Sequence, residues 1–249
     1  MKRALASLAG LGLVLVIGCV QEYDFRMAKT IDNKRYQKRL NDNLEAPPAK
    51  TNLQTGNIFV RPPKGLQGPH KTFGLAALET GKFDVEDTFA DPQKQASLHI
   101  LARVTVPKPP GKKASSPAET TQRGDFTDDV LELLKNAYGA DFDKSRLKND
   151  EKKSPNGRTN SFKSLTQDLT ANNREIKVYL IGEKNSLEKV ALIFDYPKEE
   201  ARTLSSKINL CLESFAVGGA ATRLFAGAGD DEVGGDHGGA GTTAPAGVC

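Results

Sequence analysis

VALIFDYPKEEARTLSSKINLCLESFAV, residues 190–217, has the strongest structural pattern in the sequence. Its first seven residues carry apolar side chains at both odd and even positions, which predicts a central strand covered on both faces. Pro197 suits the first position of a helix, and the acidic residues Glu199 and Glu200 suit its first turn. Apolar residues then recur at spacings of three and four: Ala201, Leu204, Ile208, Cys211 and Phe215. This spacing predicts a helix, ended by Gly218, that packs one narrow apolar face on a sheet.

Four further segments upstream have the pattern of strands. Residues 176–181 alternate between apolar and polar side chains, and the short connection at 182–189 favours antiparallel pairing with the strand at 190–196. Residues 96–106 alternate in the same way, and residues 162–169 are a further candidate. The run Ile58-Phe59-Val60 is closed by prolines at 62 and 63, which predicts an edge strand or a strand end.

A second helix is predicted over residues 125–139. Thr127 is expected to cap its N-terminus, and Asp128 and Asp129 place negative charge in its first turn. Gly139 is expected to end it in the left-handed conformation. The predicted fold class is therefore α+β: an antiparallel sheet of about five strands covered by two main helices, in an α/β/α sandwich-like arrangement.

Polar, Pro-rich and Gly-rich segments surround this single domain, predicted over residues 57–217. Residues 107–124 contain four prolines and two glycines, and residues 141–160 are strongly charged, so both are expected to be flexible insertions. Residues 218–249 form a Gly/Ala/Asp-rich tail that we expect to be disordered. Residues 19–56 are predicted to be a tether with a charged helix around 27–44. The alternative for that helix is a basic surface lying on anionic lipid headgroups.

The N-terminal 19 residues have the layout of an export signal. Lys2 and Arg3 precede fifteen uncharged residues, a length that suits a signal-peptide core and is shorter than a membrane-spanning helix. The stretch ends in Val16-Ile17-Gly18-Cys19, which resembles the lipobox of bacterial lipoproteins, with Val16 where leucine is commonest. The alternatives are an ordinary cleaved signal peptide and an uncleaved anchor.

The lipoprotein resemblance implies a chemistry and a location. Residues 1–18 would be removed after Gly18, Cys19 would carry a diacylglycerol thioether, and its new amine would take a further acyl chain such as palmitate. Two or three acyl chains hold a protein firmly, since each buried methylene contributes roughly 0.8 kcal/mol. The expected location is the cell membrane or outer membrane, lipid-anchored, with the domain facing the periplasm or the exterior. The expected membrane partner is lipid.

Charge and the scarcity of reactive side chains exclude several functional classes. Without Lys2 and Arg3 the chain has 33 Lys and Arg against 31 Asp and Glu, a balance that does not favour nucleic acid as a partner. The three histidines, at 70, 99 and 237, show no metal-ligand spacing, so no metal, cofactor or catalytic residue is predicted. Cys211 and Cys249 could form a disulfide; the simpler interpretation is a core Cys211 and a free terminal thiol.

The order of the elements, in particular the strand and helix over residues 190–217, resembles the photosystem II oxygen-evolving P-subunit family. That resemblance implies an α/β/α sandwich and non-enzymatic accessory or assembly proteins, some of them lipoproteins. The leading hypothesis is accordingly a non-enzymatic binding or assembly module in the envelope, with another envelope protein as its partner. The alternatives are a structural envelope component and a periplasmic hydrolase. The hydrolase predicts a deep pocket holding His70 or His99 beside a carboxylate or hydroxyl.

Overall fold

The computed structural model describes residues 23, 25–70, 82–104, 124–155, 157–182 and 188–228. The predicted lipidation and cleavage residues, Cys19 and Gly18, lie outside this range, as do His237, Cys249 and nearly all of the Pro-rich insertion. The N-terminal helix includes Tyr23 and residues 25–43. The other helices are α2 (Asn52–Thr55), α3 (Phe126–Tyr138), α4 (Ala201–Ser214) and α5 (Gly219–Ala228), with 3₁₀ turns η1 (Lys144–Arg146), η2 (Thr170–Asn172) and η3 (Lys198–Glu200). The strands are β1 (Ile58–Phe59), β2 (Gln67–His70), β3 (Val85–Asp91), β4 (Ala96–Arg103), β5 (Lys148–Lys153), β6 (Thr159–Leu169), β7 (Arg174–Ile181), β8 (Lys189–Pro197) and β9 (Ala216–Val217).

Seven of these strands form one antiparallel sheet in the order β2-β3-β4-β8-β7-β6-β5. β8 lies in the middle of the sheet and pairs with both β4 and β7, so its prediction as a central strand is confirmed. β1 pairs with β9 in a separate two-stranded sheet. The α+β class is confirmed, with more strands than the five expected.

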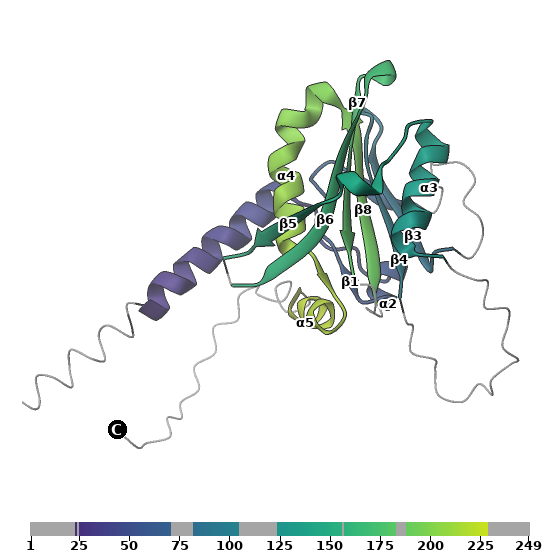
Figure 1. Cartoon of the computed structure of the whole chain (residues 1–249). Coiled ribbons are helices and arrows are strands. Elements are labelled where there is room, and N and C mark those ends of the chain that lie inside the picture. The colour runs from purple at the N-terminus through teal and green to yellow at the C-terminus, as the bar shows by residue number, and fades with distance from the viewer. Residues whose placement is uncertain are drawn as a thin grey trace, which may run out of the picture.

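Helices cover both faces of the sheet (Figure 1), because alternate residues of the central strands are apolar on both sides. On one face, Leu192 and Phe194 of β8 join Ile208 and Cys211 of α4 in the larger core cluster. On the other face, Ala191 and Ile193 join the apolar residues of α3. The predicted sandwich-like layering, with α3 and α4 as its two main helices, is therefore present.

The two predicted helices differ from expectation at their ends. Asp125, rather than Thr127, caps α3: its carboxylate accepts hydrogen bonds from the backbone N–H groups of Thr127 and Asp128. Gly139 ends α3 in the left-handed conformation, as predicted. α4 ends at Ser214 rather than at Gly218, because Phe215 is extended and buried and the next residues pair with β1.

The strands that the sequence missed lie mostly at the edges of the sheet. β5 and η1 occupy part of the segment that was predicted as a flexible insertion at 141–160, so that prediction is wrong for these residues. The sequence of β5 is KNDEKK, without a single apolar residue. Such a strand pairs with β6 along its whole length, and its charges discourage pairing with other chains.

The domain also extends beyond both predicted boundaries. Residues 219–228 form α5, whose Ala221 is buried and whose Phe225 packs edge-on against Phe59 of β1, so this part of the predicted disordered tail is ordered. Upstream, Leu40, Leu44 and Leu53 are almost fully buried in the larger core cluster. The predicted tether of residues 19–56 is therefore wrong over its second half, which belongs to the folded domain.

Candidate functional site

The N-terminal helix has two halves with different surroundings (Figure 1). Its first half projects away from the sheet, and its second half lies beside α4. We define Tyr23 and residues 25–35 as the outer half and residues 36–44 as the docked half. Every described residue from 25 to 32 is exposed, whereas Tyr36, Leu40 and Leu44 are buried at spacings of four.

Backbone and side-chain hydrogen bonds fix the docked half to the domain. Glu45 donates its backbone N–H to the carbonyl of Pro62 at 2.8 Å, and Lys64 donates to the carbonyl of Asn43 at 2.8 Å. The Arg61 guanidinium donates to the carbonyl of Glu45 and to the side-chain oxygen of Asn41, each at 2.9 Å. The chain leaving the helix is thus paired with the segment after β1.

Tyr36 is the largest side chain that the docked half buries. Burial raises the pKa of its phenol to about 12, and the nearby carboxylate of Glu213 acts in the same direction. The Tyr36 hydroxyl has no hydrogen-bond partner among the described residues. Arg39 lies over the Tyr36 ring and donates to Glu213 of α4 at 3.2 Å. The docked half therefore combines an apolar seam with one interhelical ion pair.

The outer half exposes apolar side chains to an unusual degree. Four large apolar side chains are exposed within the described part of the chain, and all four belong to this helix: Tyr23, Phe25, Met27 and Ile31. Tyr23, Met27 and Ile31 recur every four residues, so they form one stripe. Leu40 follows Ile31 by nine residues, roughly two and a half helical turns, so the stripe faces away from the docked side.

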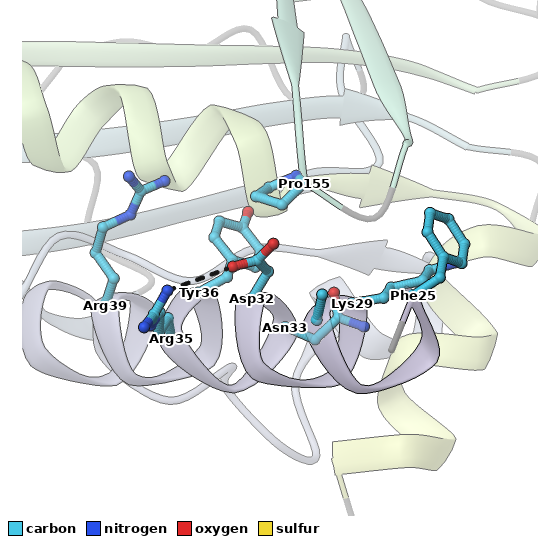
Figure 2. Close-up of a pocket in the computed structure, with 9 residues that line it drawn as sticks. Phe25, Lys29, Asp32, Asn33, Arg35, Tyr36, Arg39 and Pro155 are labelled. Carbon is cyan, nitrogen blue, oxygen red and sulfur yellow. Dashed lines mark ion pairs between the residues drawn. The ribbon is translucent and has the colours of Figure 1, made fainter. Parts of the chain in front are cut away.

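A groove of about 580 Å³ lies between this helix and the turn connecting β5 to β6. Figure 2 shows Phe25, Tyr36 and Arg39 on the side of the helix that faces Pro155 of that turn. Asp32 and Arg35 form an exposed ion pair at 3.6 Å. The lining residues are Phe25, Ala28, Lys29, Asp32, Asn33, Arg35, Tyr36, Arg39 and Pro155. This lining can hold an apolar or anionic group, and it contains no serine, cysteine or histidine for nucleophilic catalysis.

His99, one of the two histidines expected in a hydrolase pocket, is instead part of the core. It is 4% exposed on the α3 side of the sheet. Its Nδ1 lies 3.0 Å from the Thr88 hydroxyl and its Nε2 lies 2.9 Å from the Ser97 hydroxyl, so both ring nitrogens are engaged. Burial lowers the pKa of His99 to about 4, against a smaller opposing effect of Asp195. A neutral ring held between two hydroxyls is a structural element of the sheet.

The carboxylate whose charge acts on His99, that of Asp195, is bonded to other residues. Asp195 of β8 accepts from the Tyr138 hydroxyl at 2.8 Å and from Nε of Arg174 at 2.7 Å. These bonds tie the end of α3 to the sheet. Burial and the negative charge of Asp195 also raise the pKa of Tyr138 above its usual range. His70, the other candidate, is exposed at the end of β2.

Cys211 lies in the core, as the simpler interpretation of the sequence predicts. Cys211 is fully buried in α4, its thiol is free, and burial raises its pKa to about 12, as suits a core residue. Within the described ranges, no three or more His, Cys, Asp or Glu side chains gather closely enough to hold a metal ion. Over the same residues, no helix is long and apolar enough to cross a bilayer.

The site is hard to see in the sequence because two apolar stripes follow one another along the helix. The first is Tyr23, Met27 and Ile31, and the second, on the opposite face, is Tyr36, Leu40 and Leu44. The spacing of five between Ile31 and Tyr36 is the pattern that reveals the change of face. Pro155, from the opposite side of the groove, has no sequence pattern that links it to this helix.

Known proteins resemble this chain in fold only. No family model matches the chain, and no curated protein matches it. Among solved structures it is similar to the cyanobacterial PsbP of Synechocystis sp. PCC 6803, with a TM-score of 0.37 and 13% identity over 71% of this chain and 93% of that one. It is also similar to the Ran-binding protein Mog1p of Saccharomyces cerevisiae, with a TM-score of 0.36 and 16% identity over 69% and 96%. Neither similarity bears on what this chain does.

Proposed function

We propose that this chain is an envelope lipoprotein, anchored through acylated Cys19, whose α+β domain is a non-enzymatic binding or assembly module. The observation that carries the proposal is the position of the N-terminal helix. It begins within a few residues of Cys19, and its docked half is part of the domain core. A lipid on Cys19 would therefore hold the domain through a helix with a fixed position on it.

The surface of the helix supports binding rather than catalysis. The groove beside Pro155 offers two aromatic rings, Phe25 and Tyr36, and the cations of Lys29 and Arg39. Aromatic and arginine side chains are the residues that most often dominate protein interfaces. The anticipated partner is an envelope protein that presents an apolar side chain beside a carboxylate.

Metabolic labelling with a palmitate analogue tests the anchor. The native chain should incorporate the label, Cys19→Ser should not, and the matched variant Cys249→Ser should incorporate as much as the native chain. Mass spectrometry of the N-terminal peptide should find it starting at Cys19. An unlabelled native chain, or equal labelling of Cys19→Ser, would refute the proposal.

Site-specific photo-crosslinking tests the binding surface. A photoreactive residue at Phe25 should give a discrete adduct in intact cells, and one at the exposed Lys163 of β6 should not. Adding Arg39→Glu to the Phe25 probe should reduce the adduct by roughly tenfold, because the charge facing the partner is reversed. Equal adducts from both positions would contradict a specific site.

A further inference from the structure

We propose that the outward stripe of the N-terminal helix, Tyr23, Met27 and Ile31, lies in the lipid interface, so that the helix is held between the bilayer and the domain. This inference rests on the proposed anchor at Cys19. It goes beyond that anchor because it assigns a second membrane contact and a defined orientation.

The geometry of the helix provides two opposite faces. The stripe residues are 42–62% exposed, whereas Tyr36, Leu40 and Leu44 on the docked face are at most 7% exposed. Because helical residues advance by roughly 100° each, Ile31 and Leu40 point in opposite directions. A membrane on the stripe side therefore does not collide with the domain on the docked side.

The chain upstream of the stripe identifies lipid as its occupant. Tyr23 follows Cys19 by four residues, a span of at most about 14 Å when fully extended. The stripe therefore lies within reach of the headgroups whenever Cys19 is acylated. Tyrosine favours the membrane–water interface, and side chains such as Met27 and Ile31 enter the acyl boundary of interfacial helices. A protein partner on this face would have to compete with the bilayer next to it.

Charge complements the apolar stripe to a modest extent. Lys34 and Lys38 continue the same face at spacings of three and four, and both are exposed. Long lysine side chains can reach lipid phosphates while their stems cover apolar surface. Residues 20–43 carry six Lys and Arg against four Asp and Glu, a net charge of +2. We therefore expect contact with the bilayer to depend mainly on the stripe and only weakly on anionic lipid.

The chain has no tryptophan, so a single introduced tryptophan reports on its own surroundings. The test uses the full lipidated chain in phosphatidylcholine vesicles whose acyl chains are brominated, with Ile31→Trp as the probe. The matched control is Thr203→Trp on an exposed position of α4. Ile31→Trp should lose at least half of its fluorescence relative to non-brominated vesicles, and Met27→Trp should do the same. Thr203→Trp should be unchanged.

The outcomes separate the inference from the anchor. Flotation on a density gradient shows whether the protein is bound to the vesicles. If it is bound but neither Ile31→Trp nor Met27→Trp is quenched, the helix stands away from the bilayer and the inference is wrong. If the protein does not float at all, the anchor has failed, and the inference falls with it. Quenching confined to the two stripe positions supports both.

Discussion

The two halves of the N-terminal helix both carry more basic than acidic residues, but only one of them packs against the domain. The outer half carries four Lys and Arg with one Asp, and the docked half carries two with one Asp. Nevertheless, the outer half exposes its apolar residues, whereas the docked half buries Tyr36, Leu40 and Leu44. The outer half is the more strongly charged, and its apolar residues have a phase that faces away from α4. Only the docked half presents three apolar residues to the domain core.

The contacts of the docked half also explain how a helix with so few apolar residues is held against the domain. Most of the stability of a helix in a protein comes from the packing of its apolar face, so contacts with the domain are what stabilise this helix. The docked half supplies those contacts, together with the backbone hydrogen bonds around Pro62 and Lys64. The outer half is an extension of a stabilised helix, free to present its side chains to something else.

The largest expected effect is that of truncating the docked half. Leu40→Ala should lower the free energy of unfolding by about 3 kcal/mol, because Leu40 is buried in the larger core cluster. The matched variant Ile31→Ala should change it by less than about 0.5 kcal/mol, because Ile31 is exposed. Urea unfolding in a detergent that keeps the lipidated chain soluble measures both. Similar losses would mean that both halves pack against the domain.

The buried phenol of Tyr36 predicts an alkaline loss of stability. Its pKa of about 12 in the folded chain lies above the ordinary value of 10.0, so the folded state retains the proton longer. The contribution of this group is complete below about pH 10 and is lost as the pH rises towards about 12, with roughly 1 kcal/mol gone at about pH 11. Tyr36→Phe should lack this component. An identical alkaline profile in both proteins would show that the docked half does not bury this ring.

The same substitution tests the unpartnered hydroxyl at neutral pH. Because the Tyr36 hydroxyl is buried without a partner among the described residues, Tyr36→Phe should be neutral or stabilising by up to about 1 kcal/mol. Tyr23→Phe, at the exposed end of the outer half, should have no effect. A clear destabilisation by Tyr36→Phe would reveal a hydrogen bond to that hydroxyl.

The smallest effect concerns two ion pairs that the helix makes with described residues. Arg39 pairs with Glu213 across the interface with α4, and Arg35 pairs with Asp32 within the outer half. Arg39→Ala should cost about 0.5 kcal/mol and Arg35→Ala close to nothing, because exposed pairs within one helix contribute little. A double-mutant cycle with Glu213→Ala measures the first coupling. A coupling energy as small as that of the Arg35–Asp32 pair would show that Arg39 does not help to hold the docked half against α4.

Sequence patterns predicted the centre of this fold better than its edges. The apolar periodicity of β8 and α4 identifies them because burial on two faces, or on one helical face, leaves a direct trace in the order of residues. β5 leaves no such trace, since KNDEKK contributes hydrogen bonds but no apolar side chain. The groove was equally hidden, because its lining combines Phe25 of the helix with Pro155 of the turn between β5 and β6, which are far apart in the sequence. Gly18 and Cys19 remain a prediction from the lipobox resemblance alone.

Intramolecular crosslinking in native membranes tests most directly whether the docked half is a fixed part of the domain. In a Cys249→Ser background, Arg39→Cys with Glu213→Cys should be joined by a short bismaleimide, since these two side chains meet at 3.2 Å. Lys38→Cys with Glu213→Cys should not be joined, because Lys38 is the adjacent residue on the outward face. Cys211 is fully buried and should not react. Equal yields from the two pairs would contradict the account, since a helix that moves freely as a tether brings both positions to α4 equally often.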